Sequence, residues 1–230
     1  MDNGTKSIVE ICCYNVESVR VSANAGAHRV ELCSPAFTGG GSPAAEDITA
    51  AKKLNIKVNV MLHPREGDYC YDKISFELLR AQILQAKKLG ADGIVLGVND
   101  NKDNVDVERT AELVKLCAPL EVTFHKAFEL VDDPFRALDQ LIEIGVKRVL
   151  TSGTKKTVLD GKEILKKLNE HAAGRIIIMA GGSLRSSNIA EIYKLGIREF
   201  HSSALIGDAK ISSEEEIKKT LEQLSLVSKQ

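Results

Sequence analysis

The sequence predicts a single parallel (β/α)8 barrel of the TIM type that spans residues 1–230 as one domain. Two observations predict this fold. Short β-rich runs alternate with amphipathic stretches along the chain, and several helical stretches end in one recurring phrase. The chain length is also close to the roughly 250 residues of a typical barrel of this kind. A doubly wound open sheet is the alternative, but no G-x-G-x-x-G follows the first predicted strand.

Eight apolar runs are the expected strands, because parallel strands buried on both faces have consecutive apolar residues. Helical stretches separate these runs, so the strands are expected to be parallel and to close into a barrel. In chain order, the runs are Ile8–Cys13, Arg29–Cys33, Lys57–Leu62, Gly93–Gly97, Leu120–His125, Arg148–Ser152, Arg175–Met179 and Arg198–Ser202.

Three helices have clear signals in the sequence. The first is Ile74–Leu89, which Gly90 ends. The second opens at Asp133 and Pro134, a capping residue followed by proline at the first helical position. The third starts at Ser212 or Ser213, and the acidic residues 214–216 suit the positive end of its dipole. Their expected apolar faces are Leu78, Leu79, Ile83, Leu84, Ala86 and Leu89 for the first, Phe135, Leu138, Leu141 and Ile142 for the second, and Ile217, Leu221 and Leu224 for the third.

A recurring phrase connects several helices to the strands that follow them. It reads NAGAHRVEL, KLGADGIVL, EIGVKRVL and KLGIREF, and in each case a glycine is followed by a small or apolar residue and then a strand. A glycine after the last helical residue is a common way to end a helix. The repetition indicates repeated strand–helix units.

Composition excludes several classes of protein. Lysine and arginine number 31 and aspartate and glutamate 32, so there is no basic excess for binding nucleic acid or a membrane surface. The longest apolar run, residues 176–180, is too short for a membrane span of about 20 residues. The N-terminal residues do not resemble a signal peptide, and five cysteines is an odd number. We therefore expect a cytoplasmic protein with free thiols.

Two glutamate–cysteine pairs end the first two predicted strands. If the apolar residues between them face the helices, strand alternation directs Glu10, Cys12, Glu31 and Cys33 into the barrel mouth. Buried glutamates need a partner, and two interpretations stay open. One is a glutamate–arginine network that braces the barrel, and the other is a binding or acid–base site. The expected partners are Arg65, His125 and Lys126.

The Cys12 and Cys33 thiols on neighbouring strands suggest a site for Cu(I), which prefers soft sulfur ligands. Met61 or a histidine would complete it. The alternative is that both cysteines act as small buried hydrophobes. Cys13 is expected to face the helices, and no role is predicted for Cys70 or Cys117.

An anion site is predicted after the last two strands. Gly181 and Gly182 follow the seventh strand, and Ser202 and Ser203 end the eighth, where many barrels hold a phosphate. Backbone N–H groups free of side chains can approach an anion closely. A tight turn without ligand is the alternative. A bound anion would raise the pKa of His201 beside it or of His125 across the barrel.

These residues belong to phrases that resemble the CutC family of copper homeostasis proteins. The matching phrases include EIC at 10–12, RVELCS at 29–34, PREGDYCY at 64–71, VTFHKAF at 122–128, RVLTSG at 148–153 and REFHSSA at 198–204. The resemblance implies a cytoplasmic TIM barrel, a homo-oligomer such as a dimer or tetramer, and a role in copper tolerance or trafficking with Cu(I) at Cys12 and Cys33. His63 and Lys126 stand where the family usually has arginine, and Ala180 stands where it has proline.

Two functional hypotheses follow, with a scaffold that carries a vestigial site as a third. The first is a copper homeostasis protein that binds Cu(I) through Cys12 and Cys33. The second is an enzyme that acts on a small anionic or phosphorylated molecule. Its expected catalytic residues are Glu10, Glu31, His125 and His201, and its expected anion-binding residues are Arg65, Lys126, Thr151, Ser152, Gly181, Gly182, Ser202 and Ser203.

Overall fold

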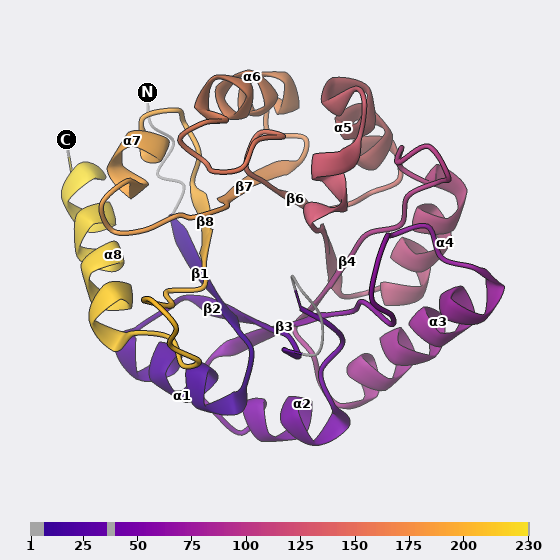
Figure 1. Cartoon of the computed structure of the whole chain (residues 1–230), viewed down its shortest axis with the longest axis horizontal. Coiled ribbons are helices and arrows are strands. Elements are labelled where there is room, and N and C mark those ends of the chain that lie inside the picture. The colour runs from indigo at the N-terminus through magenta and orange to yellow at the C-terminus, as the bar shows by residue number, and fades with distance from the viewer. Residues whose placement is uncertain (1–6, 36–39, 230) are drawn as a thin grey trace.

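The computed structural model describes residues 7–35 and 40–229. Eight strands form a closed barrel in the order β1 to β8, and every neighbouring pair is parallel, including the pair of β8 with β1 that closes the ring. Figure 1 looks down this barrel and shows the helices as an outer ring around the strands. The predicted (β/α)8 fold is confirmed.

All eight strands occur where the sequence predicts them, and their ends differ from the prediction by at most two residues. The strands are β1 Ile8–Cys13, β2 Arg29–Leu32, β3 Lys57–Met61, β4 Gly93–Leu96, β5 Glu121–Phe124, β6 Arg148–Thr151, β7 Ile177–Gly181 and β8 Glu199–Ser202. The largest shift is in β7, which starts and ends two residues later than expected. Strand ends depend on the neighbouring ladder, which the apolar pattern does not encode.

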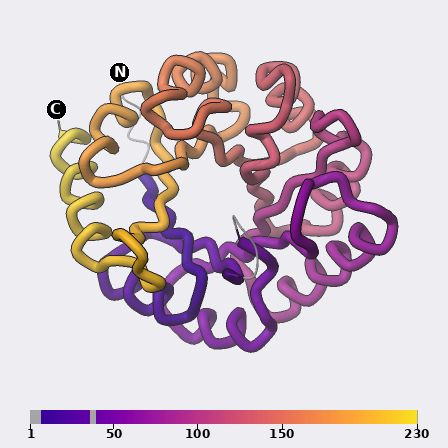
Figure 2. Tube along the Cα trace, viewed as in Figure 1, coloured from indigo at the N-terminus to yellow at the C-terminus, as the bar shows by residue number. Residues whose placement is uncertain are grey.

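Helices follow the strands around the outside of the barrel, as the tube in Figure 2 shows. They are α1 Val16–Ala25, α2 Ala45–Ala51, α3 Lys73–Lys88, α4 Val107–Cys117, α5 Pro134–Glu143, α6 Lys162–Ala172, α7 Ile189–Tyr193 and α8 Glu214–Val227. A short 3-10 helix, η1 Lys126–Leu130, lies between β5 and α5. None of the described helices is long and apolar enough to cross a membrane.

The helix signals in the sequence correspond to real caps. Asp133 accepts hydrogen bonds from the N–H groups of Phe135 and Arg136 at the start of α5, and Ser213 caps α8. The glycines of the recurring phrase, Gly26, Gly90, Gly145 and Gly196, have φ between 83° and 87°. This left-handed conformation favours glycine, which explains why the phrase recurs at helix ends.

The predicted apolar face of α3 is partly wrong. The helix buries Leu79, Ile83 and Ala86 as expected, together with Phe76. Leu78 and Leu84, which the prediction placed on the same face, are exposed. A stripe facing the sheet covers only part of the helix circumference, and these leucines lie beyond its edges.

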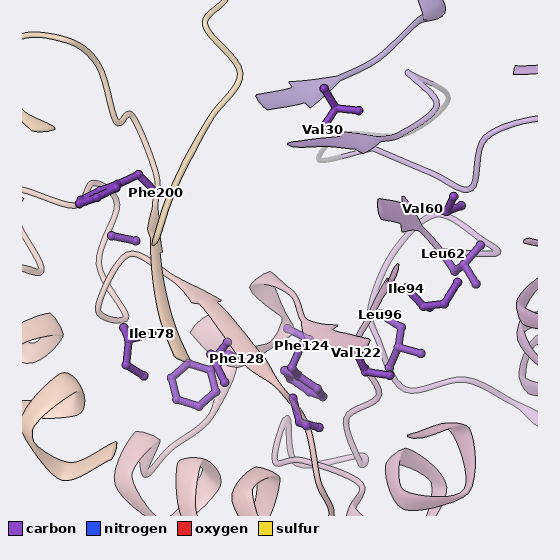
Figure 3. Close-up of a cluster of buried hydrophobic side chains, with 14 of the residues drawn as sticks. Val30, Val60, Leu62, Ile94, Leu96, Val122, Phe124, Phe128, Ile178 and Phe200 are labelled. Atoms are coloured by element: carbon purple, nitrogen blue, oxygen red, sulfur yellow. The ribbon is translucent and has the colours of Figure 1, made fainter. Parts of the chain in front are cut away.

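The main core lies between the barrel and its helices. Outward-facing side chains of the strands, such as Val30, Ile94 and Phe200, pack there with apolar residues of the helices. Figure 3 shows part of this cluster. Inside the barrel, a second and much smaller apolar cluster consists of Cys12, Cys33, Met61 and Val95. The barrel interior is therefore the part of the protein in which polar and sulfur-bearing side chains collect.

Candidate functional site

A cavity of about 230 Å³ lies at the carboxyl ends of the strands. Its lining has three parts, which we name by their chemistry. The thiol wall is Cys12, Glu31 and His201; the imidazole wall is His63, Tyr69 and His125; and the cationic wall is Lys126, Gly182, Arg185, Ser202 and Ser203. Side chains from β1, β2 and β8 and from loops after other strands thus meet at the end of the barrel where this fold places active sites.

Below the cavity, a charged layer fills the barrel. Arg29 at the start of β2 donates a hydrogen bond to Glu10 over 2.6 Å and also contacts Glu199. Arg148 at the start of β6 donates to Glu199 over 3.1 Å and to Glu121 over 2.8 Å. These buried arginines are paired on more than one side, which is the condition under which a charge is tolerated in a protein interior.

This layer corrects the predicted partners of the glutamates. The cations that neutralise Glu10 are Arg29 and His201, and neither Arg65 nor Lys126 contacts it. Arg65 lies in the loop after β3, where it pairs with Asp68 over 2.5 Å and donates to the carbonyl of Cys70. The glutamate–arginine network that braces the barrel, which was one of the two interpretations of Glu10, is present.

His201 connects the charged layer to the cavity. Its Nδ1 lies 2.8 Å from Glu10 Oε1, and its Nε2 lies 3.7 Å from Glu31 Oε2. Burial favours the neutral ring, but the nearby Glu31, Cys12 and Glu10 outweigh burial and raise the pKa of His201 well above its ordinary value. Burial by itself would raise the pKa of Glu10, but the positive charges of Arg29 and His201 lower it to about 2. The two side chains therefore form a buried imidazolium–carboxylate pair.

The thiols of Cys12 and Cys33 are adjacent on the inside of β1 and β2. Their sulfurs are 3.7 Å apart, and Cys33 Sγ lies 3.2 Å from Glu31 Oε2. The hydrogen bond from Cys33, with the help of His201, lowers the pKa of Cys12 well below its ordinary value. Burial and the proximity of Cys12 raise the pKa of Cys33. Of the two thiols, Cys12 is therefore the one that loses its proton more readily.

Glu31 is an unusual carboxyl group. Burial, together with the charge of Cys12, raises its pKa to about 8. It is therefore protonated at neutral pH, unlike Glu10 directly below it. Two neighbouring carboxyl groups with opposite protonation states are a pattern that enzymes use for acid–base chemistry. Within the described residues, Cys12, Glu31 and Cys33 also form a group whose ligand atoms all lie within 4.8 Å of one another.

The other cysteines lie away from this site. Cys13 points outward, as strand alternation predicts, and its sulfur contacts Ser22 of α1 at 3.5 Å. Cys117 is buried at the end of α4, and Cys70 is partly exposed in the loop after β3. All five thiols are free.

The imidazole wall contains two histidines and a tyrosine. The rings of Tyr69 and His125 are 4.7 Å apart between centroids, and those of His63 and His125 are 6.3 Å apart. Burial and the neighbouring His63 lower the pKa of His125 to about 3. His125 is therefore neutral, which makes it unsuited to donating its proton as a general acid, in contrast to His201.

The cationic wall adds an arginine that the sequence analysis missed. Arg185 donates to Ser202 Oγ over 3.2 Å and to the carbonyls of Leu184 and Leu205. Lys126 also lines the cavity. Gly182 and Ser203, predicted for anion binding, line it as well. The only sequence signal for Arg185 is its position three residues after Gly182, which does not specify where the side chain lies.

Several predicted anion-binding residues have other contacts. Thr151 accepts a hydrogen bond from Gly153, and the N–H of Ser152 donates to Glu129. Gly181 lies below the cavity, where a Cβ would come within 3.0 Å of His201 Cβ. Thr151, Ser152 and Gly181, like Arg65, lie outside the residues that line the cavity. The glycine at 181 instead makes room for the side chains of Leu150 and His201.

The chain is similar to CutC proteins over most of its length. The family model for the CutC family matches residues 7–206. The copper homeostasis protein cutC homolog of Mus musculus is 41% identical over 203 residues, which are 87% of this chain and 75% of the mouse protein. The family protein CutC of Photorhabdus laumondii is 40% identical over 197 residues, 85% of this chain and 79% of that protein.

Similarity also extends to the three-dimensional structure. The solved structure of CutC from Streptococcus agalactiae matches with a TM-score of 0.81 and 29% identity, and the match covers 86% of this chain and 98% of that one. The segment matched by the family model includes both thiols, the Glu10–His201 pair and the cationic wall. The protein therefore belongs to the CutC family, the family of copper homeostasis proteins that its sequence resembles.

Proposed function

We propose that this protein binds Cu(I) through Cys12 and Cys33 and acts in copper tolerance or trafficking. The observation that carries the proposal is the distance of 3.7 Å between the two sulfurs. Two thiolates that each lie about 2.3 Å from a d¹⁰ ion can be separated by no more than about 5 Å. Both sulfurs can therefore reach one ion, and soft sulfur ligands are the kind that Cu(I) prefers.

The surroundings of the thiols support the same ion. Met61 belongs to the same buried cluster as both cysteines and offers a third soft sulfur. Metal ligation requires a deprotonated thiol, and the lowered pKa of Cys12 favours that form. Cys12 also lines the cavity, so an ion could enter from the open end of the barrel.

Competition for Cu(I) with bathocuproine disulfonate tests this proposal. The wild-type protein is expected to withdraw one equivalent of Cu(I) from the chelator, and Cys12→Ser combined with Cys33→Ser is expected to withdraw none. Cys117→Ser is the control, because that thiol is buried in the outer core. An equal loss in the double variant and in the control would reject the assignment.

A second function is favoured by the cationic wall: catalysis on a small anionic or phosphorylated molecule. Arg185 and Lys126 both bring a positive charge to the cavity, and Arg185 donates a hydrogen bond to Ser202. His201, supported by Glu10, and the protonated Glu31 would transfer protons there. These residues would bind and orient the molecule and exchange protons with it.

Phosphate titration tests the second function. Inorganic phosphate is expected to shift the His201 imidazole resonances and the Gly182 amide resonance in NMR spectra, because both groups line the cavity. Arg185→Met is expected to weaken binding at least about tenfold, since hydrogen bonds to charged groups contribute about 1.5–3 kcal/mol. If phosphate shifts neither resonance, the anion site is only a turn.

The cytoplasmic location and the homo-oligomeric state stay predictions.

A further inference from the structure

We infer that Cys12 is the nucleophile of a cysteine–histidine–glutamate triad completed by His201 and Glu10, and that it accepts the acyl group of a small acyl phosphate. This inference rests on the second function proposed above, in which the cationic wall holds an anionic group. It adds the chemical class of the substrate, the bond that breaks and the residue that attacks it.

The three side chains are connected in the order that covalent catalysis requires. Glu10 Oε1 lies 2.8 Å from Nδ1 of His201, so Nε2 is the ring nitrogen that is left for a second partner. His201 and Cys12 are in turn joined by a side-chain hydrogen bond. A nucleophile within hydrogen-bond reach of a base, with the base oriented by a third group, is the arrangement that identifies covalent catalysis on unrelated folds.

Hydrogen-bond donors surround the sulfur of Cys12. The sulfur of Cys33 lies 3.7 Å away, and the hydroxyl group of Tyr14 and the ring of His201 are also hydrogen-bonded to Cys12. All three contacts favour the thiolate, which is the nucleophilic form of cysteine. The sulfur is therefore prepared for attack before a substrate arrives.

Cys12 faces the cavity with its side chain. The alternation of β1 directs this side chain into the barrel, and Cys12 is one of the residues that line the cavity. Its backbone is part of the parallel ladder with β2, so Cβ and Sγ are the atoms that face the cavity. Cys12 is 6% exposed, whereas Cys13 and Cys117 are fully buried. Since His201 lines the same cavity, a bound molecule meets the nucleophile and its base together.

The cationic wall selects a substrate with an anionic leaving group. Arg185 and Lys126 line the cavity, and among the described residues neither forms an ion pair with a carboxylate. Arg185 instead donates to Ser202 and to two backbone carbonyls, so its charge is not neutralised. Positive charges that are held in place stabilise the negative charge that develops during a reaction. A phosphate group that leaves a carbonyl carbon develops such a charge.

The size of the cavity favours a molecule in which the anionic group and the electrophilic carbon are close together. The volume of about 230 Å³ is below the roughly 300–1,000 Å³ of typical ligand sites. In an acyl phosphate, a single oxygen atom joins the phosphorus to the carbonyl carbon. A short acyl phosphate therefore presents its phosphate to the cationic wall and its carbonyl carbon to Cys12 without a spacer between them.

The reaction has two steps that balance without a cofactor or an oxidant. In the first, the Cys12 thiolate attacks the carbonyl carbon, a carbon–sulfur bond forms, and the bond from that carbon to the phosphate oxygen breaks. The electron pair of the broken bond leaves with the phosphate, which takes the Nε2 proton of His201. In the second, water adds to the thioester and gives a proton to His201, and the electron pair of the carbon–sulfur bond returns to Cys12. The products are a carboxylic acid and inorganic phosphate.

Acetyl phosphate tests the inference with the full chain. The protein is used free of metal, because Cu(I) on Cys12 would block the nucleophile. Wild type is expected to release phosphate at least about a hundredfold faster than Cys12→Ser, as expected for removal of a catalytic group. Acid-quenched wild type is expected to carry an acetyl thioester on Cys12, which mass spectrometry of peptides detects and hydroxylamine removes. Cys117→Ser is the matched control and should keep both properties, because this thiol is buried in the outer core.

Two further variants test the rest of the triad. His201→Gln should lower kcat for phosphate release at least about a hundredfold, because the thiol loses its acid and base. Glu10 is a positioning residue that acts through His201, so Glu10→Gln should lower kcat and leave the affinity for inorganic phosphate unchanged. An unchanged kcat, or an equal loss of affinity, would remove Glu10 from the triad. If Glu10→Gln does not fold, a downfield Nδ1–H resonance of His201 is expected in NMR spectra of wild type, and its absence would have the same meaning.

The outcomes separate this inference from the function on which it rests. If phosphate shifts the Gly182 amide resonance but wild type and Cys12→Ser release phosphate from acetyl phosphate equally, the role of Cys12 is wrong, while the anionic ligand stands. Transfer of a phosphoryl group to Cys12 in place of the acetyl group overturns the assignment of an acyl substrate. If neither phosphate nor acetyl phosphate binds, the anionic function itself is wrong, and this inference is wrong with it.

Discussion

Glu10 and His201 are 191 residues apart in the sequence, and their side chains are 2.8 Å apart inside the barrel. They are also register partners, because β8 pairs with β1 and closes the ring. The pair connects the charged layer, through Arg29, to the thiol of Cys12. The part of the cavity that carries reactive groups is therefore built on the junction between the first and last strands.

Arg29 is expected to contribute strongly to the free energy of unfolding. Replacing it by methionine leaves Glu10 and Glu199 buried without their shared cation. Removing one partner of a buried ion pair costs about 3–5 kcal/mol. Urea denaturation measures the loss. Arg65→Met is the control, because its pair with Asp68 is partly exposed and should contribute no more than about 1 kcal/mol.

His125 is expected to make stability depend on pH in a defined direction. Its pKa is about 3 in the folded protein and near 6.5 when unfolded, so only the unfolded chain takes up the proton between these values. The contribution of His125 to the free energy of unfolding is therefore largest well above pH 6.5 and decreases as the pH falls toward 3. From pH 6.5 to 4.5, the free energy of unfolding of wild type relative to that of His125→Phe should decrease by about 2 kcal/mol. A difference that stays constant would contradict the neutral ring.

Cys12 is expected to be the most reactive of the buried thiols. The contact with Cys33 lowers its pKa, whereas burial raises the pKa of Cys13 and raises that of Cys117 to about 12. In a Cys70→Ser background at pH 7, iodoacetamide should modify Cys12 at least about tenfold faster than it modifies Cys13 or Cys117, because the thiolate is the reactive form. Mass spectrometry of proteolytic peptides measures the order in which the cysteines are modified. Faster modification of Cys117 would contradict this assignment.

Asp133 is expected to stabilise α5 through its cap. The carboxylate accepts hydrogen bonds from two N–H groups of the first turn, at 3.0 and 3.1 Å. Asp133→Ala should lower the free energy of unfolding by about 1 kcal/mol, whereas Asp133→Ser should recover most of the loss. Thermal or urea unfolding of the two variants measures the effect, and equal losses would argue against capping by the side chain.

Much of the fold could be predicted because its signals are local. The apolar runs predicted the strands. Glycines such as Gly26 and Gly145 marked helix ends, because the left-handed conformation found there favours glycine. The alternation of side chains also placed Cys12 inside the barrel and Cys13 outside it. The exposure of Leu78 and Leu84 was less predictable, because the angle at which a helix meets the sheet depends on its neighbours.

The partners of the site residues were harder to predict. Arg29 opens β2, yet it lies beside Glu10, the third residue of β1, because strands in a closed barrel are staggered. The amount of stagger is a property of the whole barrel and cannot be predicted from the sequence of any single strand. Arg185 was missed for a different reason: its position depends on the path of the loop after β7, which the glycine pair does not specify.

The junction of β8 with β1 also has a consequence for how the protein is made. A ribosome produces Glu10 and Cys12 early and the residues of β8 late, and domains generally fold once their whole sequence is available. Until His201 has emerged, the thiol of Cys12 lacks the imidazolium that favours its charged form. The environment of Cys12 at this junction is therefore assembled only after β8 has been synthesised, and nascent chains that lack β8 do not yet have it.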